Sequence, residues 1–391
     1  MYPKHSHRRQ FLKQLPAIGT PMLCSGSLLD HLVFAPNVGS KTRPNAAIPD
    51  AGQTWIKIDG HIYGAKADDR GPIGGGEGYR YVFSANHMIV RDRDALIRAL
   101  AVALPGDVIV IPGDVTIDLT TYVYIDSFAL EIPAGVTLAS DRGYNGSQGA
   151  LITSDALKTD PLIQILGSNV HISGLRIQGP NGKRHMEHHA KAFDPGGKRH
   201  DYYYKFPVSV GVETVFDGLE VDNCELSAFS RAAISLKSGG NHHIHHCFIH
   251  HCQYNGLGYG ISHDVSNSKI AYNLFDHNRH SIAGTGRAGS GYIAQHNVEL
   301  GISLSHCFDM HGGNDRKDGT TIAGEYIDMS NNTFWAPQHA IGIRGAPERA
   351  ATIERNWFVP HISYFAAIKG LDFSRILAKD NAFGMKPTKV K

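Results

Sequence analysis

One short pattern of apolar and polar positions recurs along the chain from residue 172 onward. It reads apolar, two residues, Asn or Cys, one residue, apolar, as in the copies around Asn332 and Asn356. The fourth positions of all copies, weaker ones included, are 175, 224, 247, 273, 297, 332, 356 and 381. Most spacings are close to 24 residues, the first is about two units, and the 35-residue step is one unit plus about eleven residues.

A unit of that length cannot bury a core alone, but stacked units can. Apolar residues on both sides of a recurrent Asn indicate two short strands that meet at a tight turn, since Asn tolerates left-handed backbone conformations. Stacked Asn side chains would then form a hydrogen-bonded ladder. Leucine-rich repeats need a Leu scaffold that is missing here, and helical repeats need a 3.6-residue period. The pattern therefore predicts a solenoid of stacked β-strands.

The segment that precedes the repeats predicts how the solenoid begins. Residues 91–100 are amphipathic and helical, with Leu96 and Leu100 on one face. The strand-like segments 105–112 and 130–138 follow, reading PGD-V-I-V-I-P and L-E-I-P-A-G-V-T-L. Together they resemble the entry to the β-helices of the pectate-lyase-like superfamily, over roughly residues 90–385. The resemblance implies an all-β, right-handed parallel β-helix whose N-terminal helix caps the open end. This fold hosts lyases, hydrolases, epimerases and inert adhesins.

The N-terminus predicts export. Residues 7–13 contain Arg8-Arg9 followed by Phe-Leu-Lys and resemble a twin-arginine export signal; a plain basic tail is the alternative. The apolar stretch that follows is broken by prolines and glycines and would make a poor membrane helix. We therefore expect a signal peptide over 1–35, an N-terminal extension over 36–89 and the β-helix domain over 90–391. The expected location is periplasmic or extracellular, without a membrane span.

The composition argues against two classes of protein. The 391 residues are 42% apolar and 19% charged with a net charge of +2, which argues against disorder and against nonspecific nucleic-acid binding. We expect a monomer. Cys24 lies in the expected signal; the other four cysteines, Cys224, Cys247, Cys252 and Cys307, lack the paired spacing of a zinc site and are interpreted as core residues. The histidine-rich segment 242–252 suggests a metal, but alternation points neighbouring side chains to opposite faces. A His/Cys ladder in the Asn register is the favoured interpretation.

The segments between repeat copies should supply a third strand to each coil. If the apolar residues of 232–237, 308–311 and 340–344 point inward, the polar residues that alternate with them point outward. These outward residues are Lys237, Asp309, His311 and Arg344. Because coils stack about 4.8 Å apart, they would form a column that matches successive sugars of a bound chain. Chance placement on one exposed face is the alternative.

One stretch adds a resemblance to a particular activity. Tyr259-Gly-Ile-Ser-His263 resembles the Y-G-F-D-P-H signature of alginate C5-epimerases, in which Tyr and His are the acid–base pair. Tyr259 and His263 match that pair, Ser262 stands where the family has Asp, and Lys237 is the candidate for the assisting lysine. Strict alternation puts Tyr259, Ile261 and His263 on one face. Either a bulge separates them or His263 is a core residue.

The chemistry of such a site is proton abstraction from a uronate. The C5 proton becomes removable when a cation neutralises the carboxylate, a role for which Arg279, Arg287 and Arg344 are candidates. A histidine or tyrosine then takes the proton, with His280 a further candidate. Reprotonation from the far face gives epimerisation, and loss of the C4 substituent gives a lyase. The glycine-dense segment 279–291 would let substrate approach the backbone; as a phosphate loop it lacks the following Gly-Lys-Ser/Thr.

Two insertions add candidate ligands. The segment 309–318 holds Asp309, Asp315 and Asp318, whose oxygens suit calcium, which stays open as a cofactor. It also holds Arg316, a candidate for substrate binding beside Asp309 and His311. The longer insertion 181–206 combines basic and aromatic residues, with Lys183 and Tyr202 as candidate contacts to an anionic glycan. A solvated loop is the alternative.

These patterns together predict a carbohydrate-active protein whose ligand is an acidic, uronate-containing polysaccharide. A polysaccharide lyase or a uronate C5-epimerase is the first hypothesis. A glycoside hydrolase on the same fold is the second, but it needs two carboxyls across the cleaved bond, and Asp309 is the only outward acid in the column. A non-catalytic glycan-binding or surface protein is the third.

Overall fold

The computed structural model describes residues 52–83, 87–370 and 373–390, all within one compact unit. The expected signal peptide over 1–35 lies outside the described residues. Within the described ranges, no helix is long and apolar enough to cross a membrane.

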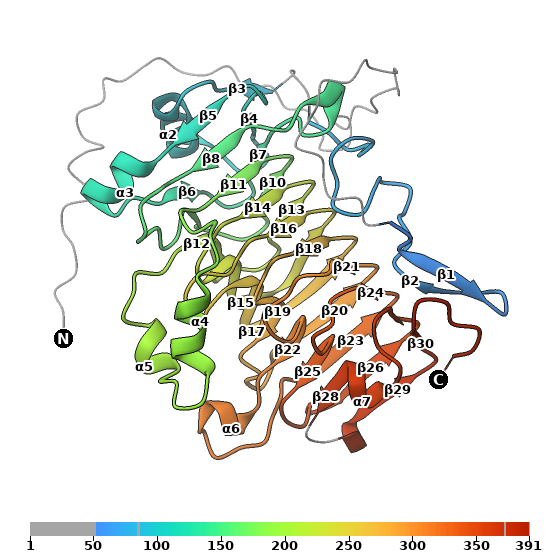
Figure 1. The fold of residues 1–391 in the computed structure, drawn as a ribbon. Coiled ribbons are helices and arrows are strands. Elements are labelled where there is room, and N and C mark those ends of the chain that lie inside the picture. Colours follow the sequence, from blue (N-terminus) through green and yellow to red (C-terminus); the bar gives the residue numbers. More distant parts are fainter. Residues whose placement is uncertain (1–51, 84–86, 371–372, 391) are drawn as a thin grey trace. The chain divides into compact units, whose positions relative to one another are not determined.

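Stacked parallel strands form the body of the structure (Figure 1). Each strand pairs in parallel with strands of the coils before and after it, in one sheet of 18 strands and another of ten. The expected right-handed parallel β-helix is confirmed. The 18-strand sheet bends through the long strands β15 (Ala232–His245) and β17 (Tyr259–Ala271) and so contributes two faces. We call these faces A and B, and the ten-strand sheet face C.

The strands of each face follow one another coil by coil. Face A holds β6 (Leu130–Ile132), β9 (Ile163–Ile165), β12 (Val210–Thr214), the first halves of β15 and β17, β19 (His280–Gly284), β22 (Phe308–Met310), β25 (Ile341–Ile343) and β28 (Ile368–Gly370). Face B holds β3 (Met88–Ile89), β4 (Val108–Val110), β7 (Thr137–Ala139), β10 (His171–Ser173), β13 (Glu220–Asp222), the second halves of β15 and β17, β20 (Gly291–Gln295), β23 (Tyr326–Ser330), β26 (Ala350–Glu354) and β29 (Ile376–Lys379). Face C holds β5 (Thr116–Asp118), β8 (Leu151–Thr153), β11 (Arg176–Gln178), β14 (Glu225–Ser227), β16 (Phe248–His250), β18 (Leu274–Asp276), β21 (Val298–Glu299), β24 (Thr333–Phe334), β27 (Trp357–Phe358) and β30 (Ala382–Phe383).

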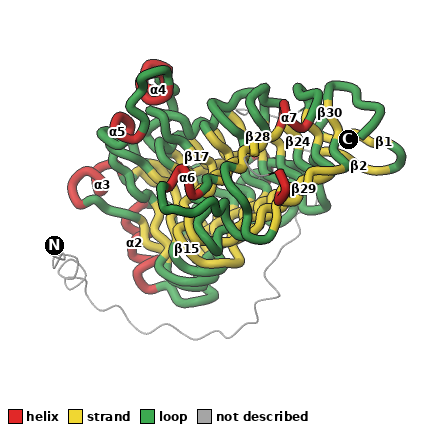
Figure 2. Tube along the Cα trace, turned by 90° about the horizontal axis from the view of Figure 1, so that it is seen from below, coloured by secondary structure: helices red, strands yellow, loops and turns green. Residues whose placement is uncertain are grey.

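The helices lie on the outside of the stacked strands (Figure 2). They are α2 (Arg93–Val102), α3 (Thr120–Asp126), α4 (Met186–Phe193), α5 (His200–Tyr203), α6 (Gly313–Arg316) and α7 (Tyr364–Ala367), with 3-10 turns at Tyr144–Gly146 and Phe373–Arg375. The expected capping helix is confirmed as α2. Asp92 begins it by accepting a hydrogen bond from the Ala95 backbone, and Leu96 and Leu100 join the core.

A ladder of buried asparagines runs along the turn between faces B and C. The Asn332 backbone donates to Asn356 Oδ1 at 2.9 Å, and the Asn356 backbone donates to Asn381 Oδ1 at 2.9 Å. The expected ladder is therefore present, and Cys247 takes the same register by donating its backbone N–H to Asn273 Oδ1. The recurrent Asn is not itself the left-handed residue of the turn. The left-handed residue is the one before each ladder position, and these residues are Asn223, His246, Tyr272, His296, Asn331, Arg355 and Asp380.

The N-terminal extension crosses the coils in reverse order. The hairpin of β1 (Trp55–Ile58) and β2 (His61–Gly64) packs against the last coils, where Tyr63 Oη donates to Asp380 at 2.7 Å. We call residues 65–83 the strap. Ala65 N donates to Thr333 Oγ1, Gly74 N to the Tyr272 carbonyl and Gly76 N to Asn223 Oδ1. The sequence did not predict this path.

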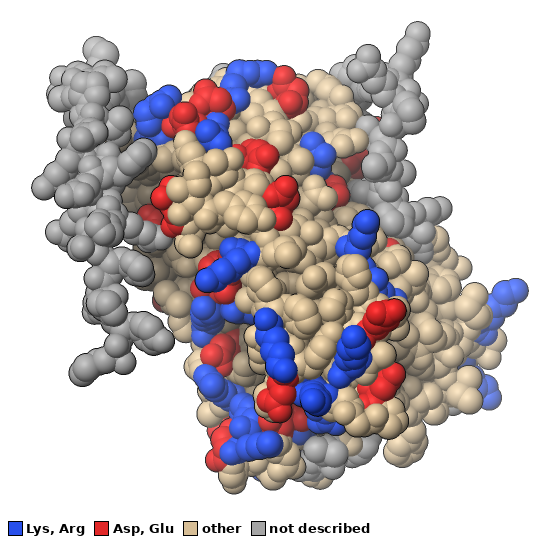
Figure 3. Space-filling view, turned by 60° about the vertical axis from the view of Figure 1, so that its left-hand side comes forward, with Lys and Arg blue, Asp and Glu red and all other residues tan. Residues whose placement is uncertain are grey.

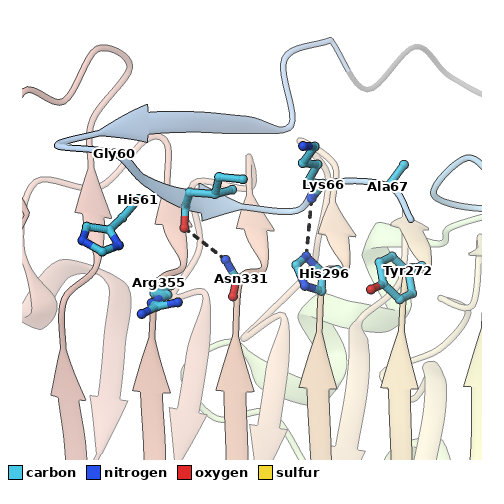
Figure 4. A pocket seen from close by; sticks show the side chains of 9 residues that line it. Gly60, His61, Lys66, Ala67, Tyr272, His296, Asn331 and Arg355 are labelled. Carbon is cyan, nitrogen blue, oxygen red and sulfur yellow. Dashed lines mark hydrogen bonds between the residues drawn. The ribbon is translucent and has the colours of Figure 1, made fainter. Parts of the chain in front are cut away.

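The strap does not fill all the space against the turn. A cavity of about 420 Å³ remains between it and the left-handed turn residues (Figure 4). Tyr272 and His296, whose rings stack at 5.0 Å, line its floor, and Lys66 N approaches His296 Nδ1. Asn331 Nδ2 donates to the Ile62 carbonyl across it.

One buried hydrogen bond closes the strap at its far end. Tyr79 Oη donates to Asp222 Oδ2 at 2.5 Å, and both side chains are buried. Tyr79→Phe leaves this acceptor one partner short, so we expect the free energy of unfolding to fall by about 1–3 kcal/mol. Urea titration checks this, with the exposed Tyr124→Phe as control. Equal unfolding midpoints for the two variants would show that this bond does not secure the strap.

Candidate functional site

Four aromatic side chains form a column at the start of the face A strands. Tyr259 pairs with His280 in register, and their rings stack with centroids 5.8 Å apart. His280 stacks on His306 at 5.8 Å, and His306 contacts His339 at 5.9 Å. The column therefore joins four successive coils along one edge of face A.

Asp309 is the centre of the cluster beside this column. Phe308 and Met310 on either side of it point into the core, so the Asp309 side chain points outward, yet it is 0% exposed. Arg344 Nη2 donates to Asp309 Oδ2 at 2.6 Å. Three histidine nitrogens also face this carboxylate: His311 Nε2 at 3.3 Å, His306 Nδ1 at 3.5 Å and His280 Nε2 at 3.8 Å. Neighbouring side chains thus replace water around one buried charge.

A glycine leaves room for this arrangement. Gly342 pairs with Asp309 in register on the next strand. A Cβ at Gly342 would lie 2.8 Å from His306 Cγ and 3.0 Å from Asp309 Oδ1, which is too close for either side chain to stay in place. The cluster therefore requires glycine at this position.

The protonation of the cluster follows from burial and neighbouring charge. Burial alone would raise the pKa of Asp309, but the guanidinium of Arg344 and the contact from His311 outweigh it and hold the pKa well below the ordinary carboxyl value. Burial, followed by the positive charge of Arg279, pushes the pKa of His280 well below the ordinary histidine value. At neutral pH, Asp309 is a carboxylate and His280 is a neutral imidazole.

Arg279 lies between two aromatic rings. Its guanidinium carbon is 4.7 Å from the Phe193 ring centroid and 5.9 Å from that of Tyr259. Phe193 comes from α4, so the insertion 181–206 supplies one wall of the site. Arg279 Nε is buried without a hydrogen-bond partner, and no ion pair of the described residues includes its guanidinium. Figure 3, which brings the α4 and α5 side of the molecule forward, shows further lysine and arginine side chains on this surface.

No family model and no curated protein matches this chain. Similar solved structures include an alginate lyase from Paenibacillus sp. strain FPU-7, at 12% identity and a TM-score of 0.39, over 77% of this chain and 98% of that chain. An exopolygalacturonase of family 28 from Yersinia enterocolitica has 13% identity and a TM-score of 0.43, over 77% and 66% of the two chains. The catalytic unit of an α-1,3-glucanase from Streptomyces thermodiastaticus has 11% identity and a TM-score of 0.41, over 78% and 58%. Likeness at this level carries no argument about activity.

Six of the residues expected from the sequence come together in this site. They are Tyr259, Arg279, His280, Asp309, His311 and Arg344. Asp315, on α6, joins them because its carboxylate lies 3.3 Å from Arg344 Nη1 and 3.9 Å from His311 Nδ1. Arg344 thus bridges two carboxylates.

His263 does not have the outward position expected of a catalytic base. It continues the inward column of Leu236 and Met310, is buried, and bonds Ser268 Oγ through Nε2 at 2.6 Å. The strand is regular at this point, so the alternative that we stated for His263 holds: it is a core residue. It cannot act as the base towards a ligand on the outer surface. His280, not His263, is the histidine beside Tyr259.

The other expected side chains lie apart from Asp309 and have partners of their own. Lys237 pairs with Glu213 at 2.6 Å on an earlier coil, and Arg287 pairs with Asp264 at 3.0 Å. Arg316 donates to the carbonyls of Thr285 and Ile322 and so holds the α6 loop rather than facing outward. On the insertion, Lys183 is exposed and Tyr202 bonds His188.

The three carboxylates proposed for calcium do not converge. Asp318 accepts hydrogen bonds from Thr320 and Arg316, which hold its pKa at about 2, whereas Asp309 and Asp315 face Arg344. Sequence reasoning also missed His306 and Phe193. His306 lies 26 residues after His280, close to one coil, and that spacing is the signal that would have placed it beneath His280.

Proposed function

We propose that this protein is an exported enzyme that acts on an acidic polysaccharide by removing the C5 proton of a uronate, as a lyase or a C5-epimerase. The observation that carries the proposal is Arg279, a guanidinium beside two aromatic rings and without a carboxylate partner among the described residues. The proposed location, periplasmic or extracellular, rests on the N-terminal arginine pair alone.

Arg279 has the properties of a receptor for a substrate carboxylate. The guanidinium of Arg279 lies near the rings of Phe193 and Tyr259, and its Nε has no hydrogen-bond partner, so an N–H edge is left for a bidentate contact with a planar anion. A uronate carboxylate bound there loses much of its negative charge. Removal of the neighbouring C5 proton becomes easier, because charge that develops at C5 spreads onto the neutralised carboxylate.

His311 is the group that we assign as base. Its side chain is 30% exposed, and its Nε2 faces the buried carboxylate of Asp309 at 3.3 Å. Such a contact orients the imidazole and stabilises the imidazolium that forms when the base takes a proton. Tyr259 lies on the other side of His280 and is the candidate acid.

The proposed elimination balances in one step. His311 takes the C5 proton, and the C5–H electron pair forms a double bond between C4 and C5. The bond between C4 and the glycosidic oxygen breaks, and this oxygen receives a proton from Tyr259. In an epimerase, Tyr259 would instead return a proton to C5 from the opposite face.

A hydrolase fits the cluster less well. It needs one carboxyl that gives a proton and a second that acts as base or nucleophile. Asp309 is held ionised and is surrounded by Arg344 and histidines, so it has no proton to give. Asp315 is paired with the same arginine.

The test is turnover of a panel of uronate polymers, including alginate, polygalacturonate and hyaluronan. Ultraviolet absorbance of unsaturated ends reports a lyase, and exchange of the C5 proton in heavy water, followed by NMR, reports an epimerase. Arg279→Lys should lower kcat/KM on the active polymer by about 100-fold, because an ammonium lacks the bidentate edge. The control is Arg287→Lys, on an exposed arginine already paired with Asp264. No turnover on any polymer, or full activity of Arg279→Lys, would overturn the proposal.

A further inference from the structure

Three side-chain atoms of the Asp309 cluster point at one another without hydrogen bonds. They are His280 Nε2, His306 Nδ1 and Asp309 Oδ1, and each is buried without a partner. Ligand atoms of these three residues all lie within 4.8 Å of one another. Buried polar atoms are normally paired. Three unpaired atoms this close together therefore indicate that one bound group is their shared partner.

The tautomer of His280 identifies the chemistry of that partner. His280 Nδ1 lies 2.5 Å from the His306 carbonyl oxygen, which only accepts, so the ring proton is on Nδ1. Nε2 therefore presents a lone pair, 3.8 Å from Asp309 Oδ2. A lone pair beside a carboxylate is unfavourable unless a positive charge lies between them. A backbone carbonyl that fixes the ring of a histidine in this way is the usual support of a metal ligand.

We propose that His280 Nε2, His306 Nδ1 and Asp309 Oδ1 form a binding site for one divalent transition-metal ion, with zinc as the best match. Two imidazoles and one carboxylate are a common ligand set for zinc and similar metals, and they leave a position open for water or a substrate oxygen. Calcium prefers oxygen ligands alone. Arg344 occupies Oδ2 of Asp309 and so leaves Oδ1 for the ion.

The surrounding charges set the expected strength. The carboxylates of Asp309 and Asp315 face the single guanidinium of Arg344, which favours a cation. Arg279 directly precedes His280 in the chain, and its positive charge disfavours a cation there. We therefore expect moderate affinity. The site does not depend on the proposed function, since an ion can bind whether or not a polysaccharide does.

A second group of possible ligands serves as an internal control. Glu220, His243 and His245 on face B also converge, contrary to our expectation that the histidines of 242–252 could not. Two of the three ligand atoms already have partners, because His245 Nε2 lies 3.1 Å from Glu220 Oε1 and 3.4 Å from Arg70 Nη1. We assign no ion to this group.

The experiment measures metal on the full chain without substrate. Chelator-treated protein is titrated with zinc by calorimetry, dialysed and analysed for bound metal, and cobalt is used as a visible-absorption probe. We expect one ion per chain and a cobalt spectrum of low coordination number. His306→Gln should weaken zinc binding at least about 100-fold, whereas His243→Gln should not change it. Circular dichroism confirms that both variants are folded.

The metal measurements on the two variants distinguish a metal site at His306 from its absence. Loss of the ion in His306→Gln with retention in His243→Gln supports the site. No bound zinc, binding unchanged by His306→Gln, or loss in His243→Gln alone overturns it. Because the readout is the bound ion, failure here is distinct from failure to act on any polysaccharide.

Discussion

Acidification from pH 6.5 to pH 4 is expected to lower the free energy of unfolding by several kcal/mol. Burial lowers the pKa of His263 to about 3 and that of His246 to about 4, against an ordinary value of 6.5. Below pH 6.5, these histidines therefore bind protons in the unfolded chain but stay neutral in the folded chain. The stabilisation is complete above pH 6.5 and is lost as pH falls towards the folded pKa. For His263 alone, this interval corresponds to about 3 kcal/mol.

Glu299 opposes this trend without reversing it. Burial raises its pKa to about 8, so its contribution to stability is complete below its ordinary value of 4.5 and is lost as pH rises through 8. Acidification therefore gains stability at Glu299, and also at Asp160 and Asp328, whose pKa values burial raises too. The depressed histidines are more numerous, since His243 and His251 also have pKa values lowered to about 3 and about 4.

Urea titrations at several pH values measure the effect, and His263→Gln isolates one contributor. The variant will differ in stability because its packing against Tyr292 changes, so the informative quantity is the slope of unfolding free energy against pH. That slope should be shallower in His263→Gln and unchanged in His61→Gln, on an exposed histidine. Identical slopes in both variants would contradict the assignment of His263 as a buried neutral histidine.

Asn332→Ala is the substitution with the largest expected cost. Asn332 Oδ1 accepts from both the backbone and the side chain of Asn297, and its Nδ2 donates to the Ala294 carbonyl. Alanine leaves these buried groups unpaired in the middle of the stack, where water cannot replace the lost side chain. At about 1–3 kcal/mol for each unpaired group, we expect a loss of roughly 3–6 kcal/mol.

The neighbouring residue gives a matched comparison. Asn331 is half-buried, has a positive φ of 54° and donates one hydrogen bond to the Ile62 carbonyl. Asn331→Gly suits that backbone conformation and removes only this bond. Its unfolding midpoint should lie much closer to that of the unchanged protein. A similar loss in both variants would mean that the ladder is not a special source of stability.

The fold was predictable because its determinants are local and periodic. The recurrent Asn at a spacing near 24 residues reports the stacked coils, and the amphipathic segment 91–100 became the cap α2. The strap was not predictable. Its partners, such as Asp222 and Thr333, are far away in the sequence and are not marked by any pattern within residues 65–83.

The candidate site was predictable only in part, for a related reason. Alternation along single strands placed Asp309, His311 and Arg344 outward, and in the structure the three side chains lie together. Pairing across coils depends on loop lengths that vary from coil to coil, so His306 was missed. His263 failed because a sequence signature was given more weight than the alternation that placed it inward.

The strap changes how this stack should come apart. In a solenoid whose coils contact only their neighbours, end coils can detach one at a time. Here one hydrogen bond joins Tyr63 to Asp380, residues 317 positions apart, and the chain that follows bonds to coil after coil back towards the first. Detachment of the last coil would free the hairpin that anchors this segment. Peeling from the C-terminal end would therefore loosen together the coils that this segment joins, and these coils should unfold in a single cooperative transition.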